Sequence, residues 1–116
     1  MKHLKKGRKF HRKRDQRKAL LKSLGEALIL KEKIITTESR AKELKRFIEK
    51  KITMAKKNSL SAHRNLRRFF SSQASHKLIK EIVPLIKNRK GGYTRIIKIA
   101  PRKRDKAEMA KIEIVK

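Results

Sequence analysis

The chain has 116 residues, which is the length of a single domain, and it contains no Cys. It carries 37 Lys and Arg against 10 Asp and Glu, which gives a net charge of +27. This composition excludes disulfides, thiolate chemistry and zinc knuckles, and it favours nucleic acid as partner, with an anionic membrane second. No apolar run reaches the roughly 18–20 residues of a membrane span, and the basic start lacks the apolar core of a signal peptide. We therefore expect an intracellular protein.

Residues 1–18 are strongly basic, with Asp15 as their single acid and almost no apolar side chains. Such a segment has nothing to pack on a core, so we expect it to be disordered in isolation. It can order along nucleic-acid phosphates; the alternative is a tail with no specific partner. We predict a basic RNA-binding extension over 1–14 and a single compact domain over 15–116. The candidate RNA-binding residues here are Lys2, His3, Lys5, Lys6, Arg8, Lys9, Arg12, Lys13, Arg14, Arg17 and Lys18.

The next stretch predicts a helix, a short strand and a second helix. Asp15 is a candidate N-cap, and residues 16–31 follow with helical spacing of apolar side chains. Gly25 interrupts that pattern, which indicates close packing against another element. The β-branched run 33–37 predicts a strand, and a helix should begin just after it, near 37–39. The apolar stripe of this second helix is Ala41, Leu44, Ile48, Ile52 and Ala55.

Two further helices are predicted before a proline. Ser59 is placed to cap the third helix, whose apolar face ends in Phe69 and Phe70. These rings could stack on nucleic-acid bases, but their helical spacing favours positions in the core. Residues 71–73 predict a loop, and Pro84 should help to end a fourth, short helix.

The C-terminal part predicts a β-hairpin. Residues 93–100 form a strand whose isoleucines fall on both faces, which suggests partial cover on each side. Alternating apolar residues over 110–114 mark a strand with one buried face, and the charged loop 101–106 makes the tip of the hairpin basic. Together with the strand at 33–37, this predicts an α+β fold: a small three-stranded sheet packed against about four helices, with a basic N-terminal arm.

A basic turn precedes the hairpin. Its two adjacent glycines lack Cβ atoms, so the backbone there can adopt a positive φ or approach another surface closely. Cationic side chains flank the glycines, and this combination suits a phosphate-rich partner. The alternative is a tight turn with solvated charges. The candidate RNA-binding residues of the turn are Arg89, Lys90, Gly91, Gly92, Tyr93 and Arg95, and those of the hairpin tip are Arg102 and Arg104.

No catalytic constellation is evident in the sequence. The acids lie among lysines and arginines, the four histidines lack metal-ligand spacing, and neither a P-loop nor a dinucleotide fingerprint occurs. We expect no enzymatic activity, no metal, no cofactor and no small-molecule substrate. One Tyr and four Phe cannot build a base-stacking platform, so we predict a protein that binds structured RNA through phosphates and shape.

Five blocks in order, nearly end to end, resemble the bacterial large-subunit ribosomal protein seventeen family. They are Met1-Lys2-His3 with Gly7-Arg8-Lys9; Arg17-Lys18-Ala19; Ile34-Ile35-Thr36-Thr37 with Ala41-Lys42-Glu43-Leu44 and Ile52-Thr53-Met54-Ala55-Lys56; Arg89 with Gly91-Gly92-Tyr93-Thr94-Arg95-Ile96; and Met109-Ala110 with Ile112-Glu113-Ile114-Val115. The resemblance implies a structural protein of the large ribosomal subunit in the cytoplasm. It also implies contacts with large-subunit ribosomal RNA near the nascent-chain exit, and neighbouring ribosomal proteins as partners.

Several positions depart from the pattern of that family. Lys2 replaces the usual Arg, Leu4 replaces a basic residue and Gln16 replaces a His. Arg104 stands where a glycine normally precedes the acid at Asp105. A turn with positive φ at the hairpin tip would therefore have to be rebuilt.

Two other classes of function compete with RNA binding. A DNA-architectural, chromatin-type protein is the main alternative, because a basic arm could also lie in a DNA groove. Against it, the sequence lacks a helix-turn-helix glycine turn, a leucine zipper and an apolar wedge at the hairpin tip. A cationic membrane-active peptide is the third class, but one shared core explains the helical stripes better.

Overall fold

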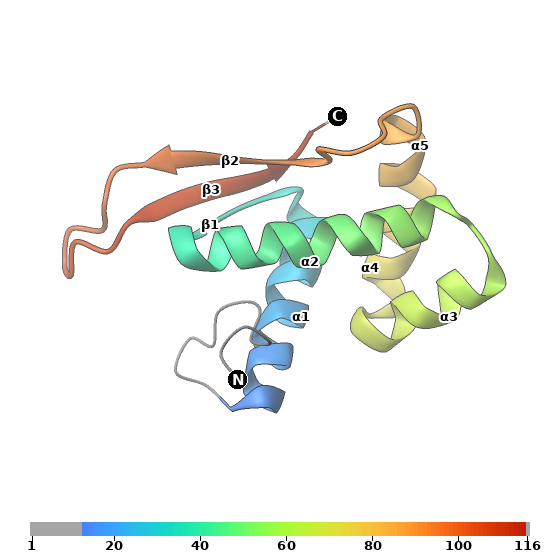
Figure 1. Cartoon of the computed structure of the whole chain (residues 1–116), viewed down its shortest axis with the longest axis horizontal. Helices are drawn as coiled ribbons and strands as arrows, with labels where there is room; N and C mark the ends of the chain where they lie inside the picture. The colour runs from blue at the N-terminus through green and yellow to red at the C-terminus, as the bar shows by residue number, and fades with distance from the viewer. Residues whose placement is uncertain (1–12, 116) are drawn as a thin grey trace, which may run out of the picture.

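The computed structural model describes residues 13–115. Its elements follow in the order α1 (Arg14–Lys31), β1 (Lys33–Thr37), α2 (Glu38–Lys56), α3 (Leu60–Phe69), α4 (Ser72–Lys77), the π-helical turn η2 (Leu78–Ile82), α5 (Val83–Ile86), β2 (Thr94–Ile99) and β3 (Met109–Ile114). Because α4, η2 and α5 follow one another without a break, the described part of the chain has four helical segments and three strands (Figure 1). The predicted α+β class is confirmed.

The central strand of the antiparallel sheet is β3, and the strand order is β1-β3-β2. Ile112 on β3 pairs with Ile34 on β1 and with Ile96 on β2, so a row of isoleucines crosses the sheet. Alternate residues of β3 are buried, which confirms the prediction of a strand with one buried face. The predicted hairpin of β2 and β3 is also confirmed.

The helices lie on one face of the sheet, and α2 runs along that face (Figure 1). All five residues of its predicted apolar stripe are buried. Thr37 caps the helix by accepting a hydrogen bond from Arg40 N at 3.4 Å. The opposite face of β2 is open in the described residues, and Ile97 there is 37% exposed. Partial cover was predicted on each side of β2, and on this open face Ile99 is half-buried while Ile97 is the more exposed of the two.

Gly25 makes room for two aromatic rings. A Cβ at this position would lie 3.1 Å from Cε1 of Phe70 and 3.2 Å from Cε2 of Phe47. These rings meet edge to face, with centroids 6.1 Å apart, and Phe70 is 4% exposed. The close packing predicted at Gly25 and the core position predicted for Phe70 are both confirmed. Phe69 is half-buried, and the ammonium of Lys51 lies 3.4 Å from its ring centroid.

We expect Gly25→Leu to destabilise the protein by about 1–3 kcal/mol, because the added side chain must displace Phe47 or Phe70 from a packed position. Urea denaturation measures the difference. Ser23→Leu is the matched control, since Ser23 is exposed on the same helix and the same side chain there should have little effect. Equal stability of the two variants would show that the space around Gly25 is not constrained.

Three helix boundaries differ from the prediction. Lys13, and not Asp15, is the N-cap of α1; Asp15 lies in the first turn, where its charge still favours the positive end of the helix. A loop was predicted at 71–73, but only Ser71 lies outside a helix: residues 72–73 begin α4, which the side chain of Ser71 caps. Pro84 does not end the fourth helix but lies at the start of α5. The π-helical turn just before it changes the hydrogen-bond pattern where proline cannot donate.

Candidate nucleic-acid interface

The structure does not bring the predicted basic features into one patch. The turn at 89–93 lies between α5 and β2, and the hairpin tip at 100–108 lies at the other end of β2 (Figure 1). A strand of six residues is about 20 Å long, so the two features are separated by that distance. The start of α1 forms a third basic feature away from both (Figure 1).

Lys56, the last residue of α2, holds the basic turn in place. Its Nζ donates to the Tyr93 hydroxyl at 3.0 Å and to the carbonyl oxygen of Arg89. The same ammonium lies 4.9 Å from the centroid of the Tyr93 ring. Tyr93 is 3% exposed, so its ring belongs to the core and offers little surface to a partner. The structure thus gives the Tyr93 side chain a positioning role, and the contact with RNA predicted for this residue stays a prediction.

The start of β2 is fixed from two further sides. Glu49 on α2 accepts hydrogen bonds from the Thr94 hydroxyl at 2.8 Å and from the Thr94 amide at 3.3 Å. Val115, just after β3, donates its amide proton to the Tyr93 carbonyl at 2.8 Å. These bonds hold the junction of turn and strand before any partner binds, which lowers the entropic cost of binding.

The turn itself is open to solvent. Arg89, Lys90, Gly91 and Gly92 are exposed, and Gly92 has φ +62°, a backbone conformation that favours glycine. A Cβ at either glycine would meet no atom within 4 Å. Of the two possibilities that the glycines left open, a positive φ is thus observed at Gly92. The open space above both glycines leaves room for a phosphate group to approach the backbone.

Two of the predicted arginines are paired with acids. Nη2 of Arg95 lies 2.7 Å from Oε1 of Glu113, and Nη1 of Arg102 lies 3.3 Å from Oδ2 of Asp105. The hydrogen bond from Arg95 lowers the pKa of the Glu113 carboxyl. The Arg95 side chain remains 60% exposed, so a phosphate would compete with Glu113 for it.

The Arg95–Glu113 pair makes stability depend on pH. Because the pKa of Glu113 is lowered on folding, the pair stabilises the fold above the usual carboxyl pKa of 4.5, and this contribution is lost as the pH falls through the folded-state pKa. We expect Glu113→Gln to lower Tm slightly at neutral pH, and the difference from the unmodified chain to disappear in acid. Thermal melts across this range, with Glu81→Gln as the control for lost charge, measure it. A difference that is constant with pH would contradict the pairing.

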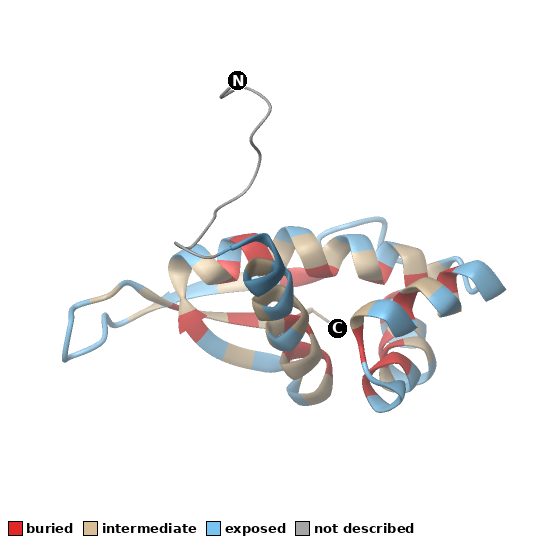
Figure 2. Ribbon diagram, turned by 90° about the horizontal axis from the view of Figure 1, so that it is seen from below, coloured by how far each residue is buried: buried red, intermediate tan, exposed pale blue. Residues whose placement is uncertain are grey.

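The hairpin tip is closed without a glycine. Lys106, and not Arg104, has a positive φ of 56°. Arg102 donates its amide proton to the Ala107 carbonyl at 3.0 Å, and Asp105 Oδ1 accepts from the Ala107 amide at 3.2 Å. The arginine at 104 is therefore accommodated without strain. The residues of the tip are largely exposed to solvent (Figure 2).

The predicted N-terminal contacts are only partly within the described residues. Lys13, Arg14 and Lys18 are exposed at the start of α1, and Arg17 is half-buried. The remaining predicted contacts lie outside the described residues; they are Lys2, His3, Lys5, Lys6, Arg8, Lys9 and Arg12.

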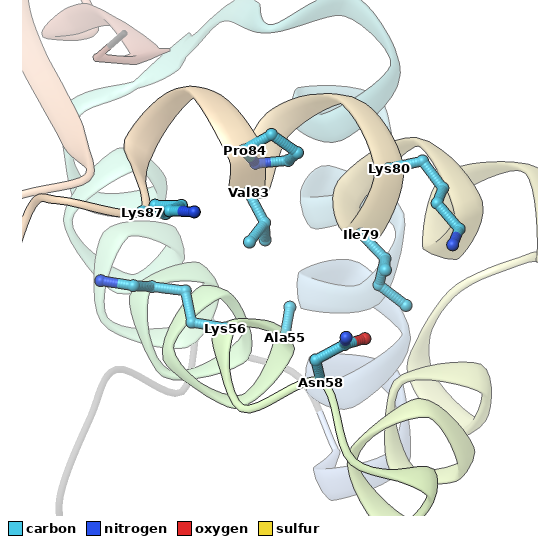
Figure 3. A pocket seen from close by; sticks show the side chains of 8 residues that line it. All are labelled: Ala55, Lys56, Asn58, Ile79, Lys80, Val83, Pro84 and Lys87. Atoms are coloured by element: carbon cyan, nitrogen blue, oxygen red, sulfur yellow. The ribbon is translucent and has the colours of Figure 1, made fainter.

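Sequence reasoning missed two lysines beside the turn. Lys56 and Lys87 line a cleft of about 420 Å³ between the C-terminal end of α2 and the η2–α5 segment (Figure 3). No spacing rule links position 56 to position 93, because the contact is made across the fold. The only sequence feature that pointed to Lys56 was its place at the end of α2, directly after the last residue of the buried stripe.

No group of three His, Asp or Glu side chains within residues 13–115 could hold a metal ion. None of the helices in this part of the chain is long and apolar enough to cross a membrane.

The fold and the surface together define the class of protein: a strongly basic α+β protein with a binding or structural role. The family described as Ribosomal protein L17 matches residues 20–115. The chain is 49% identical over 116 residues to the large ribosomal subunit protein bL17 of Fusobacterium nucleatum, covering 99% of this chain and 100% of that protein. It is 49% identical over 118 residues to the bL17 protein of Persephonella marina, which covers 99% of this chain and 95% of that protein. It is 48% identical over 118 residues to the bL17 protein of Campylobacter concisus, which covers 99% of this chain and 98% of that protein.

The chain therefore belongs to the ribosomal protein L17 family. It is a structural protein of the ribosome in the cytoplasm, and not an enzyme. The resemblance drawn from the five sequence blocks is confirmed.

Proposed function

We propose that the chain binds large-subunit ribosomal RNA through phosphate and shape contacts, near the nascent-chain exit. One observation supports this most directly. If each of the ten carboxylates paired with one cation, 27 cations would still have no acidic partner. A chain with this charge repels itself and is stabilised by a polyanion. In the large ribosomal subunit, after which the relatives are named, that polyanion is ribosomal RNA.

The domain organisation proposed from the sequence fits this role. Residues 1–14 act as an extension that contacts RNA, and residues 15–116 form the compact domain. Basic residues continue from the extension onto α1: Lys13 and Arg14 at the junction are exposed, and so is Lys18 within the helix. Phosphate contacts can therefore run from the extension onto the body of the protein.

Folded RNA suits the spacing of the basic features better than a flexible strand does. The turn and the hairpin tip are held about 20 Å apart by β2. Hydrogen bonds from α2 and Val115 hold the turn, and Asp105 closes the tip. A partner that meets both features must present phosphates at a fixed spacing, which is recognition by shape.

Neighbouring ribosomal proteins are the second proposed class of partner. The uncovered face of the sheet presents Ile35, which is 63% exposed, and Ile97, which is 37% exposed. These exposed apolar side chains lie on the two edge strands, on either side of Lys111 of β3, and favour contact with another protein. The position near the nascent-chain exit rests on family membership.

A comparison of two nucleic acids tests the proposal. We expect binding to folded large-subunit ribosomal RNA to be at least about tenfold tighter than binding to random duplex DNA of equal length at the same salt concentration. Arg89→Ala with Lys90→Ala should reduce the preference for RNA. Lys50→Ala with Lys57→Ala, which removes the same charge from exposed positions at α2, should leave it intact. Equal affinity for both nucleic acids would favour the DNA-architectural alternative.

A further inference from the structure

We propose that the cleft between α2 and the η2–α5 segment takes the base of one unpaired RNA nucleotide. A hollow beside the cleft takes an adjoining phosphate of the same strand. The proposal rests on the proposed binding of ribosomal RNA and extends it from phosphate contacts to the insertion of a base. None of the residues predicted from the sequence to bind RNA lines the cleft.

The cleft has an apolar floor and a cationic rim (Figure 3). Ile79 and Val83 point into the space between the two helical segments, with lysines at both ends (Figure 3). Its volume of about 420 Å³ lies within the roughly 300–1,000 Å³ typical of small-ligand sites. No acidic residue is among those that line it: Ala55, Lys56, Asn58, Ile79, Lys80, Val83, Pro84 and Lys87. A base can bury its apolar ring on such a floor while lysines bind its phosphates.

The second hollow is polar and adjoins the first. It has a volume of about 230 Å³ and is lined by His63, Arg67, Ser72, Ser75, His76, Ile79 and Lys80. Ile79 and Lys80 line both hollows, so the two are neighbours along one helical segment. The side chains of Asn58 in the cleft and His63 in the hollow also meet, with Oδ1 and Nε2 2.9 Å apart. One strand of RNA could therefore pass from one hollow to the other.

A buried hydroxyl in the second hollow indicates an acceptor. Ser75 is 4% exposed, and its Oγ has no hydrogen-bond partner among the described residues. Buried hydroxyls in folded proteins are nearly always hydrogen-bonded. A small shift of this side chain would let a phosphate oxygen in the hollow accept from the hydroxyl, and Arg67 and Lys80 there would balance the charge of the phosphate.

The shape of the cleft selects unpaired RNA over a duplex. A base in a helix is stacked and paired, so it cannot enter a cleft without leaving the stack. Single-stranded loops and bulges present bases that are already unstacked. The cationic rim, with no acid among its residues, favours an RNA nucleotide over a side chain from a neighbouring basic protein.

Base insertion is tested with two short strands of equal length. One is labelled oligouridine and the other has the same ribose-phosphate backbone without bases. We expect the full chain to bind oligouridine about fivefold tighter. Val83→Phe, which fills the cleft, should bring the ratio to one, whereas Lys57→Ala outside the cleft should keep it at about five. A ratio of one in the unmodified chain, or an unchanged ratio in a Val83→Phe variant shown by circular dichroism to be folded, overturns the proposal.

A crosslinking experiment covers the case in which Val83→Phe fails to fold. A photoreactive amino acid replaces Pro84, which is exposed and lines the cleft, and the assembled large subunit is irradiated. The expected product is an adduct with ribosomal RNA at an unpaired nucleotide; an adduct with a protein, or with paired RNA only, overturns the proposal. Normal binding of both short strands at a ratio of one would overturn base insertion alone. Failure to bind ribosomal RNA at all would overturn the proposed function as well.

Discussion

Deletion of residues 2–14 is expected to flatten the salt dependence of RNA binding. Each phosphate contact adds about 0.7–0.9 to the slope of log K against log salt concentration, because it releases condensed counterions. If every deleted cation contacts a phosphate, the slope falls by about 6–7. The cations that the deletion removes are Lys2, Lys5, Lys6, Arg8, Lys9, Arg12, Lys13 and Arg14. Binding to folded ribosomal RNA at several salt concentrations measures the slope.

The deletion needs two controls. Circular dichroism must show that the shortened chain still folds, since Lys13 caps α1 and is removed with the extension. A variant with the order of residues 2–14 shuffled keeps the same charge, and we expect its slope to stay close to that of the unmodified chain. An unchanged slope after the deletion would contradict the claim that these cations contact phosphates.

Tyr93→Ala is expected to lower the free energy of unfolding by about 3–5 kcal/mol. The ring is 3% exposed, so its removal leaves a cavity and also takes away the hydroxyl that accepts from Lys56 at 3.0 Å. The turn at 89–93 loses its anchor, and RNA affinity should fall as a consequence. Tyr93→Phe keeps the ring and loses one hydrogen bond, so we expect a loss of about 0.5–1.5 kcal/mol and little change in RNA affinity.

Urea denaturation and RNA binding, measured on both Tyr93 variants, separate a positioning role from a direct contact. The two properties should fall together in Tyr93→Ala, because the turn depends on the packed ring. Normal stability with lost RNA affinity in that variant would mean that Tyr93 contacts RNA itself, against its buried position in the structure.

Regular patterns of apolar residues could be predicted from the sequence. The stripe of α2 and the alternation in β3 each depend on spacing within one element, which the period of the helix or strand determines. Gly25 was also predictable as a packing site, because glycine inside a helix is unfavourable without a structural reason. The residues that contact Gly25 were not, since Phe47 and Phe70 belong to other parts of the chain.

The contacts that hold the candidate interface could not be predicted. Lys56 and Tyr93 are 37 positions apart, and Glu49 and Thr94 are 45 apart, so only the tertiary fold brings them together. Tyr93 was predicted to contact RNA because it stands between glycines and arginines in the sequence. Its burial depends on α2, which the local sequence does not reveal.

Local exceptions account for the remaining errors. Pro84 predicted a helix end, but a π-helical turn before it lets the helical segment continue. At the hairpin tip, the positive φ lies at Lys106, so the missing glycine at Arg104 has no cost there. Both cases follow from backbone geometry that residue preferences describe only on average.

Sedimentation of a cell lysate at high salt tests the central claim most directly. The protein is detected across a sucrose gradient, before and after a salt wash of the large ribosomal subunit. We predict that it travels with the large subunit and stays there after the wash, since many phosphate contacts and a fixed shape hold it to ribosomal RNA. Protein that remains near the top of the gradient, or that follows the chromosome, would contradict this account.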